Sequence, residues 1–534
     1  MMLRNVSKWS ESKRGLFFVL CLSAVIKVSI ALSNKVINPD GILYISAAQQ
    51  FALGNFREGL ALYPMPFYPL VIAFVHYFVP HWVAAARLIS ITSLVLALIP
   101  LYLLANDLFD RKVAFWGCLT FALAPLANYW AMEVIRGPSF VFLFAWAVYF
   151  AQRAIRSTRL VFFFMAVFFS WFSFLFRIEG VILIPVYLLF FICLGVWKPQ
   201  ERGPLLKGIL VWIAFPLLLF LIFFVALGPE GVSLNRLDQV MGELRDLLHL
   251  GFLDNYYRIY EKLKTLESSS PFSGLHQNFA AIARHYIPII YLFGLLQTLI
   301  KVLFPFFVIP LFWGFRHSLR QTRVFVLGLV IFYLLMVYYT LIVRDNVSTR
   351  FLFAPAFLLY PWIGVGMERM FAFLKRSSMP TFLATVFVIV FLVSPVCKCV
   401  SVLAKQDKVI SMAGEWLAKT SEFHKAKMIA TDARFLFYAG REIYGGGEGS
   451  SEYVSSQRGD IWHMNESHDY VGMEQFALAK QMDLIIVRVS VKRKNLIPEL
   501  EYYKKVKEFT GKKNIAIIYC SPEFHKTLNL EDNA

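Results

Sequence analysis

The amino-acid sequence predicts a polytopic α-helical membrane protein that ends in a small α/β domain. Of its 534 residues, 58% are hydrophobic and 16% are charged, and the mean hydropathy is +0.59. Soluble globular chains are about 45–50% apolar and about 25% charged, and a folded chain still has to present a large polar surface to water. This composition excludes a soluble enzyme, a disordered chain and a fibrous repeat protein.

Long apolar runs predict about eleven transmembrane helices, because the hydrocarbon core of a bilayer takes about 20 apolar residues per helix. The expected spans are Gly15–Leu32, Trp82–Leu104, Val113–Tyr129, Pro138–Ala151, Leu160–Phe176, Val181–Val196, Ile209–Leu227, Tyr286–Trp313, Val324–Val343, Phe351–Met367 and Pro380–Val396. The run Phe67–Val79 is short and contains proline, so we expect it to lie in the membrane interface rather than to span.

Basic residues in alternate loops predict the orientation. The segment before the first span is basic, which by the positive-inside rule places the N-terminus in the cytoplasm. Eleven spans then place residues 401–534 on the outer, periplasmic or extracellular, side of a cytoplasmic (inner) membrane. The loops on the cytoplasmic side contain Arg111 and Lys112; Arg153, Arg156 and Arg159; Lys198, Arg202 and Lys207; Arg316, Arg320 and Arg323; and Arg369, Lys375 and Arg376.

The net charge of +18 belongs to the membrane part of the chain. Residues 1–400 carry 34 Lys and Arg against 17 Asp and Glu, whereas residues 401–534 carry 19 against 18. The excess cations therefore set topology or meet anionic lipid. No basic, aromatic-interleaved soluble patch is present, so we expect no nucleic acid partner.

We expect two domains, a transmembrane domain over residues 1–400 and a soluble α/β domain over residues 401–534. In the second, Lys408–Lys419 has helical apolar spacing and Ala433–Ala439 is a short ordered piece. The β-branched runs Lys427–Thr431, Leu484–Val489 and Ile515–Tyr519 predict strands, and Gly445–Gly449 predicts a loop.

Carboxylates and arginines gather in the outer loops, at the ends of several separate spans. They are Asp40 and Tyr44 in the first loop, Glu133 and Arg136 in the second, Arg177 and Glu179 in the third, and Arg350 in the fifth. Ionisable groups at membrane depth are costly and are usually functional. We therefore expect them to converge on one polar cavity.

That set of side chains suits a phosphate-bearing lipid and an acceptor. Arginine binds phosphate through a planar fork and stays charged, and a nearby carboxylate can take a proton from an attacking hydroxyl or amine. Simpler roles stay open, since Asp40 is also a candidate helix N-cap, and Arg177 and Glu179 can form a purely structural pair.

The order and spacing of these motifs resemble the GT-C fold glycosyltransferases. The nearest groups are the dolichyl-phosphate-mannose protein mannosyltransferase and lipid A aminoarabinose transferase families. The resemblance rests on Asp40 ahead of Tyr44 and Ala47, on residues 64–70 as an interfacial helix, on Glu133 to Pro138, on residues 348–351 with Pro355, and on residues 429–432 and 437–441 in the outer domain. One departure is that Gly41 occupies the place where many relatives have a second acid.

The resemblance implies transfer of one sugar from a polyprenyl-phosphate carrier to a glycolipid, glycan or protein acceptor on the outer face. Asp40 would then be the catalytic base, with Glu133 assisting or orienting. The arginines Arg136, Arg177 and Arg350 would bind the leaving phosphate, and Tyr44 and Glu179 would complete the substrate site. We expect no cofactor and assign no residue to a metal.

The main alternative is a transporter or flippase of lipid-linked saccharides, which would share the spans and the basic cavity. Transporters usually have internal repeats and ionisable residues near the midplane. This sequence has no repeat, and its charges cluster at one face, which favours the enzyme. The sugar and the acceptor are not determined by these patterns.

Overall fold

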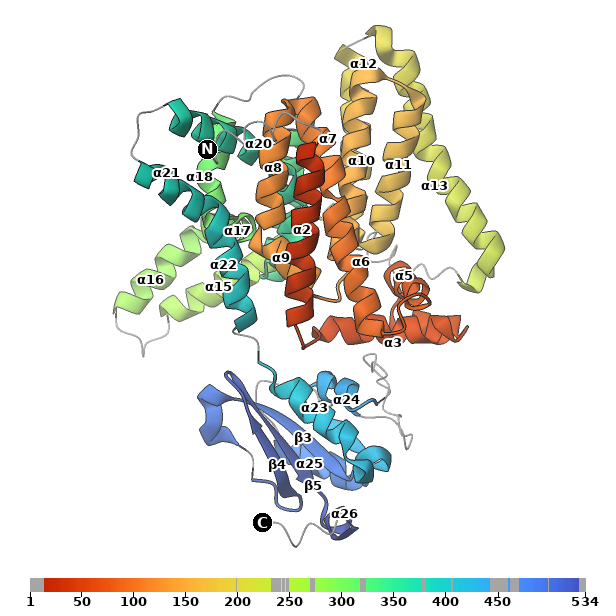
Figure 1. Cartoon of the computed structure of the whole chain (residues 1–534), viewed down its shortest axis with the longest axis vertical. Coiled ribbons are helices and arrows are strands. Elements are labelled where there is room, and N and C mark those ends of the chain that lie inside the picture. Colours follow the sequence, from red (N-terminus) through yellow and green to blue (C-terminus); the bar gives the residue numbers. More distant parts are fainter. Residues whose placement is uncertain are drawn as a thin grey trace. The chain divides into compact units, whose positions relative to one another are not determined.

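The computed structural model describes residues 14–197, 199–231, 242, 245, 249–268, 274–316, 323–376, 381–404, 407–441, 460–461, 470–497 and 499–527 (Figure 1). The chain divides into two compact units. The first contains Met1–Val28, Ser90–Ala131 and Arg136–Lys398, and the second contains Ser29–Ile89, Met132–Ile135 and Cys399–Ala534. The second unit thus groups the C-terminal residues with the first outer loop. The domain boundary expected at residue 400 stays a prediction.

The first unit is a bundle of helices. It contains α7 (Leu98–Leu108), α8 (Arg111–Leu123), α9 (Pro125–Ala131), α10 (Gly137–Ser157), α11 (Leu160–Phe176), η1 (Ile178–Ile182), α12 (Leu183–Trp197), η2 (Pro199–Glu201), α13 (Arg202–Gly231), α15 (Phe252–Ser268), α16 (Gly274–His285), α17 (Ile287–Leu303), α18 (Pro305–Phe315), α19 (Val324–Arg344), α20 (Thr349–Arg376), α21 (Thr381–Val388) and η4 (Ile389–Val393). Three helices run from one unit into the other, and these are α2 (Arg14–Ser33), α6 (Trp82–Leu96) and α22 (Ser394–Ala404).

The membrane class of the fold is confirmed, although the count of eleven spans is not. In the described part of the chain, seven helical segments are long and apolar enough to cross a membrane, and two bent pairs raise this to nine. The segments Arg14–Ser33, Trp82–Leu108 and Val324–Arg344 match expected spans closely. The expected span Leu160–Phe176 is a shorter apolar helix, and the expected interfacial run contains the short helix α5 (Phe67–His76).

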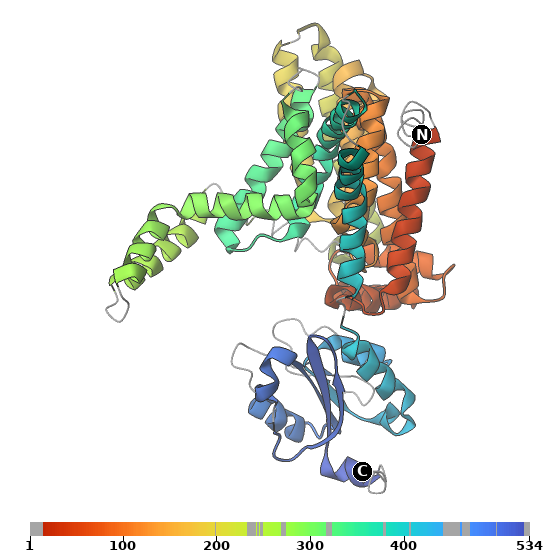
Figure 2. The same ribbon diagram turned by 60° about the vertical axis from the view of Figure 1, so that its left-hand side comes forward.

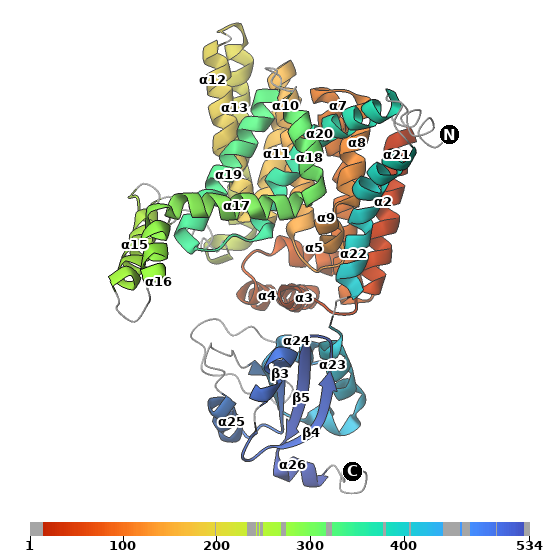
Figure 3. The same ribbon diagram turned by 90° about the vertical axis from the view of Figure 1, so that its left-hand side faces the viewer.

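The structure corrects the expected span Tyr286–Trp313, which is two helices. Phe304, with φ of +73°, separates α17 from α18, and Pro305 begins α18. Figures 2 and 3 show α17 running across the direction of α18. Proline fixes the conformation at a helix start and disfavours helical geometry in the residue before it. The uniform apolar character of this run hides the break.

The arm formed by α15, α16 and α17 is fastened to the turn between α19 and α20. Asp345 is the left-handed C-cap of α19, with φ of +53°. Its carboxylate accepts hydrogen bonds from Asn255 Nδ2 at 3.0 Å and from the Tyr291 hydroxyl at 2.5 Å. The fourth outer loop is thereby joined to the fifth, which carries Arg350.

Lys27 forms a buried polar cluster within the first unit. This lysine of α2 is fully buried, and its Nζ donates to Ser23 Oγ and to Asn128 Oδ1 of α9, both at 2.9 Å. A buried charge is tolerated only when hydrogen bonds compensate its lost hydration. Lys27 therefore ties α2 to α9.

The second unit combines short helices of the first outer loop with a five-stranded sheet. Its elements are α3 (Pro39–Ala52), α4 (Phe56–Leu62), α5, α23 (Val409–Lys419), η5 (Ser421–Lys425), β1 (Met428–Ala430), α24 (Ala433–Tyr438), β2 (Asp460–Ile461), α25 (Tyr470–Ala479), β3 (Leu484–Ser490), η6 (Val491–Leu496), β4 (Lys504–Thr510), β5 (Asn514–Cys520) and α26 (Pro522–Thr527). The strand order is β2-β1-β3-β5-β4, with β1 parallel to β2 and β3 and with antiparallel pairing of β5 to β3 and β4.

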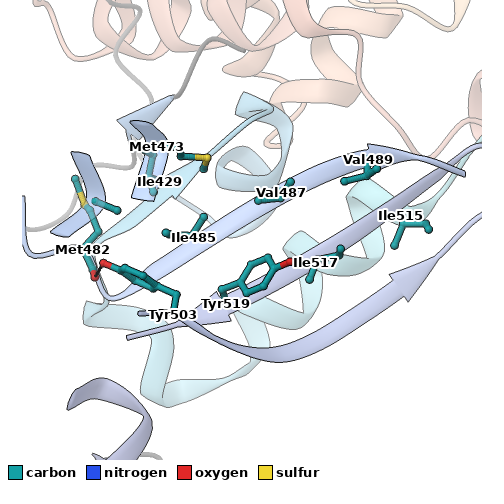
Figure 4. Close-up of a cluster of buried hydrophobic side chains, with 11 residues drawn as sticks. Ile429, Met473, Met482, Ile485, Val487, Val489, Tyr503, Ile515, Ile517 and Tyr519 are labelled. Atoms are coloured by element: carbon teal, nitrogen blue, oxygen red, sulfur yellow. Dashed lines mark hydrogen bonds between the residues drawn. The ribbon is translucent and has the colours of Figure 1, made fainter. Parts of the chain in front are cut away.

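The central strands β3 and β5 are buried almost throughout, which explains their continuous apolar sequences. Figure 4 shows part of the core, in which Ile485 and Val487 of β3 and Ile517 and Tyr519 of β5 cluster with Met473 of α25. Strand β4 was not expected from the sequence, because lysines occupy much of it. It lies at the edge of the sheet, where charged residues protect unpaired backbone groups. The expected loop Gly445–Gly449 lies outside the described residues.

Asp407 connects the start of the C-terminal domain to the start of β5 through hydrogen bonds. Its carboxylate accepts from the backbone amides of Val409 at 3.3 Å, Lys513 at 3.0 Å and Asn514 at 2.6 Å. Partial burial alone would raise the pKa of Asp407, but these donors outweigh it and lower the pKa below its ordinary value of 3.8.

Candidate active site

The two outer loops that carry Asp40 and Glu133 are pinned together by backbone-to-amide hydrogen bonds. Asn38 Nδ2 donates to the carbonyl of Val134 at 3.1 Å, and the amide of Val134 donates back to Asn38 Oδ1 at 2.9 Å. Asn34 Nδ2 adds a bond to the carbonyl of Met132 at 3.3 Å. Segments about a hundred residues apart in sequence are therefore fixed side by side, and convergence of the outer-loop residues on one polar cavity stays a prediction.

Gly41 allows this close approach. A Cβ atom at position 41 would lie 2.8 Å from the Cβ of Val134 and 2.9 Å from Asn38 Oδ1. There is consequently no space at this position for the second acid that many GT-C sequences have there. Asp40 therefore has no second acid directly after it in the sequence.

Asp40 lies in the first turn of α3 but is not its N-cap. The N-cap is Asn38, whose backbone is extended, and Pro39 begins the helix. Asp40 is half-buried, and a carboxylate in the first turn is stabilised by the helix dipole. Asp40 therefore does not occupy the N-cap position, and the side chain of Asn38, which does, makes no capping hydrogen bond.

Tyr44, one turn further along α3, is buried in an aromatic cluster. Its ring meets Tyr63 and Tyr68 edge to face, with centroid distances of 4.9 Å and 5.2 Å. Tyr63 follows α4 and Tyr68 belongs to α5, so this cluster holds the short helices of the loop together. The assignment of Tyr44 to substrate stays a prediction.

Glu133 is buried and faces two arginines that the sequence analysis did not select. It is 6% exposed and interacts electrostatically with Arg87 of α6 and Arg434 of α24. Arg87 Nη1 also donates to the carbonyl of Asn34 at 2.8 Å. The position of Arg87 inside an apolar run was the available signal, because an ionisable group there is costly.

Tyr438 joins the C-terminal domain to the first outer loop. Its hydroxyl accepts from the amide of Ile37 at 2.7 Å and donates to the carbonyl of Lys35 at 2.9 Å. The hydroxyl also lies in the electrostatic field of Arg87 and Arg434. Burial raises the pKa of Tyr438, so the hydroxyl stays protonated and can keep donating.

Arg434 is oriented by a partly buried ion network at the carboxyl ends of β1 and β3. Asp432 caps α24 and accepts from Arg434 Nε at 2.9 Å and Nη2 at 2.6 Å, and from Arg488 Nη1 at 2.9 Å. Burial opposes ionisation of Asp432, but the hydrogen bonds and charge of Arg434 lower its pKa, and the same pairing raises the pKa of Arg434. The parallel pairing of β1 with β3 brings these residues together.

In the first unit, Arg136 and Arg177 both interact with Glu179. Arg177 is 7% exposed, and its guanidinium grips the Glu179 carboxylate with both branches, Nε at 3.1 Å from Oε2 and Nη2 against Oε1. Arg136, the N-cap of α10, donates to the carbonyl of Phe176 at 3.4 Å and interacts electrostatically with Glu179.

Aromatic rings from two helices surround this pair. The Arg177 guanidinium lies 5.8 Å from the ring centre of Phe140 and 6.0 Å from that of Phe351. Arg350, which precedes Phe351 at the start of α20, is exposed. The pairing of Arg177 with Glu179 fits the simpler structural role.

The predicted site residues fall into two groups. Asp40, Tyr44 and Glu133 belong to the second unit, and Arg136, Arg177, Glu179 and Arg350 belong to the first. A single cavity shared by both groups stays a prediction. Within the described part of the chain, no three metal-binding side chains come together.

Similar solved structures define the fold. The chain matches the Archaeoglobus fulgidus oligosaccharyltransferase, in a complex with Zn and sulfate, with a TM-score of 0.54 and 14% identity, over 94% of this chain and 73% of that one. It matches ArnT from Cupriavidus metallidurans bound to undecaprenyl phosphate with a TM-score of 0.52 and 13% identity, over 95% of this chain and 98% of that one. The apo form of this ArnT gives a TM-score of 0.51, 14% identity, and 94% and 97% coverage.

Comparisons of sequence alone gave no match, either to a family model or to a curated protein. The structural likeness therefore establishes the fold, and the expectation of a GT-C fold is confirmed.

Proposed function

We propose that this protein is a membrane glycosyltransferase that moves a sugar from a polyprenyl-phosphate carrier to an acceptor on the outer face of the membrane. The observation that carries the proposal is the pairing of Asn38 with Val134, which fixes Asp40 and Glu133 on adjoining outer loops. The GT-C fold supports it, and so does the undecaprenyl phosphate bound by the similar ArnT structure.

In the proposed reaction, Asp40 accepts the proton of the acceptor hydroxyl or amine as that atom attacks the anomeric carbon of the donor sugar. A bond forms between the acceptor and the anomeric carbon, and the bond from that carbon to the phosphate oxygen breaks. The electron pair leaves with the polyprenyl phosphate. Glu133, held between Arg87 and Arg434, orients the acceptor.

Arginines stabilise the charge that develops on the departing phosphate. We assign this role to Arg136, Arg177 and Arg350. Glu179 fixes the guanidinium plane of Arg177, and the side chain of Arg350 is exposed. The chain's own residues therefore supply both the base and the cations.

We also propose the orientation in which the N-terminus is cytoplasmic and the C-terminal domain is periplasmic or extracellular. The basic loops support this placement through the positive-inside rule. The outer-loop carboxylates and the domain that carries Arg434 then face the compartment in which the acceptor is found.

The test is Asp40→Asn in purified protein reconstituted in nanodiscs, with a radiolabelled polyprenyl-phosphate sugar and a membrane extract as acceptor source. General-base catalysis contributes about 10²–10⁴-fold, so we expect turnover to fall by that factor while donor binding is kept. Helix α3 should survive, because Asn38 is its N-cap. The exposed Glu58→Gln in α4 serves as the matched control.

Two results would count against the proposal. Normal turnover of Asp40→Asn would remove Asp40 as the base. Movement of the donor across the membrane with its sugar–phosphate bond intact would instead identify a flippase.

A further inference from the structure

A cavity of about 360 Å³ opens within the second unit, between the first outer loop and α24. Helix α3 forms one wall with Ser46, Gln49 and Gln50, and Trp82 and Phe437 contribute aromatic rings. None of the residues assigned above to the donor phosphate or to proton transfer lines it. The cavity is thus a feature that the proposed reaction centre does not explain.

The polar wall of the cavity is neutral. Ser46, Gln49 and Gln50 are spaced at i, i+3 and i+4, so they share one face of α3, and all three are half-buried. A hydroxyl and two amides offer both donors and acceptors, with Gln50 Oε1 already accepting one hydrogen bond from Asn55 Nδ2 at 3.0 Å. No carboxylate is among the described residues that line the cavity.

The one cationic lining residue, Arg441, is already engaged. Its Nη1 donates to the carbonyl of His424 at 2.6 Å, and its Nη2 donates to the carbonyl of Phe423. Arg441 therefore connects the turn after α24 to η5. Because both of its Nη groups donate to backbone carbonyls, its guanidinium is not positioned to bind an anion through them. A phosphate would find poor complementarity in this cavity.

The aromatic wall is held in place. The ring of Trp82 stacks on that of His76 with centroids 3.5 Å apart and planes 12° from parallel. One face of the indole is thereby fixed, and little ordering cost remains when a ligand binds. Fixed aromatic rings beside neutral amides and a hydroxyl suit a ligand with apolar C–H faces and many hydroxyl groups, which is a neutral saccharide.

The position of the cavity along α3 indicates which part of the substrate it holds. At a rise of 1.5 Å per residue, Ser46 and Gln50 lie about 9 Å and about 15 Å along the helix axis from Asp40. A ligand in the cavity is therefore too far from Asp40 to react, but close enough to belong to the same oligosaccharide.

From this chemistry and placement we infer that the cavity binds a neutral sugar unit of the acceptor, one or more residues away from the hydroxyl that is glycosylated. The inference rests on the proposed function, and it narrows the acceptor to a saccharide-bearing molecule, a glycan or glycolipid rather than a bare polypeptide. The small volume, at the low end of the roughly 300–1,000 Å³ of ligand pockets, suits a mono- or disaccharide unit.

Direct binding tests this inference without requiring transfer. Saturation-transfer NMR on the full chain in nanodiscs, without donor, would screen neutral disaccharides of glucose, galactose, mannose and N-acetylglucosamine. We expect at least one to bind, and Gln49→Ala to weaken that binding about tenfold, the effect of losing one buried hydrogen bond to the ligand. Glu58→Gln on exposed α4 is the matched control and should bind normally.

Asp40→Asn should also bind the saccharide normally, which separates this inference from the proposed reaction. If transfer is never observed but Gln49→Ala still loses saccharide binding, the cavity assignment stands and the reaction fails. The inference is overturned if no neutral saccharide binds, if Gln49→Ala binds as the parent does, or if polyprenyl phosphate alone displaces the saccharide. In an active preparation, Gln49→Ala should raise KM for the acceptor and leave kcat unchanged.

Discussion

Replacement of Gly41 by alanine tests whether the two outer loops are packed together as described. The new Cβ would stand 2.8 Å from the Cβ of Val134, a separation below the 3.0 Å that real Cβ atoms essentially never pass. Because a Cβ is fixed to its backbone, neither atom can rotate away. The loops must separate, and the hydrogen bonds between Asn38 and Val134 must lengthen.

The magnitude follows from opposing terms. Alanine in a helix is favoured over glycine by about 0.5–1 kcal/mol, whereas overpacking costs about 1–3 kcal/mol. Weakening of the two hydrogen bonds costs a further ~0.5–1.5 kcal/mol each. We expect Gly41→Ala to destabilise the folded protein by about 1–5.5 kcal/mol and, by shifting Glu133 relative to Asp40, to reduce transfer by about 10²-fold.

The assay is a double-mutant cycle read out by thermal unfolding in detergent and by sugar transfer. Val134→Gly removes the closest of the three contacts under 3.0 Å, while those to Asn38 Oδ1 and Ile37 Cγ1 remain, so Gly41→Ala should cost less in that background than in the parent. Gly294→Ala in α17 is the control, because its Cβ meets nothing within 4 Å. Equal costs of Gly41→Ala in both backgrounds would refute the packing argument.

Two further predictions concern buried polar groups. Lys27→Met should destabilise the protein by about 1–3 kcal/mol because Asn128 loses its hydrogen-bond partner. Combining Lys27→Met with Asn128→Leu should restore much of the lost stability, as measured by thermal unfolding. A double variant that is less stable than Lys27→Met would contradict this prediction. The pKa of Asp407 is lowered, because amide donors including those of Val409 and Asn514 outweigh its partial burial. The ionised carboxylate therefore contributes fully to the stability of the folded domain above its ordinary pKa of 3.8. This contribution is lost as the pH falls through the lowered pKa. The protease resistance of the C-terminal domain should therefore differ between the parent and Asp407→Ala at pH 7 and converge as the pH falls through the lowered pKa of Asp407. A difference that persists below that pKa would exclude this linkage.

Hydropathy and strand patterns in the sequence were sufficient for the class of fold. The runs that became α2, α19 and the central strands β3 and β5 are continuous and apolar, because each is buried or meets lipid along its length. Strand β4 was not predicted, because its lysines hide the apolar pattern by which a strand is recognised. Lysines are tolerated there because β4 lies at the edge of the sheet. The break between α17 and α18 at Phe304 was not predicted, because the residues before and after it are equally apolar.

For the candidate site, the sequence predicted a contact between neighbours in the chain but not the contacts between distant segments, and the roles of the site residues stay predictions. The sequence placed Arg177 and Glu179 together because they are two residues apart, and the structure pairs them. It could not associate Glu133 with Arg434, because that contact depends on how α24 meets the first outer loop.

The sequence by itself determined that this chain inhabits a membrane, where the strands β1, β3 and β5 and most of its helices run, and which outer-loop residues are candidates for chemistry. Those properties depend on transfer free energies and on periodicities of neighbouring residues, which are local. Tertiary structure alone decided that Asn38 rather than Asp40 caps α3, that Val134 fills the space at Gly41, and that Arg441 is tied to backbone carbonyls. These outcomes depend on packing between segments distant in sequence, where a shift of one ångström changes which atoms meet.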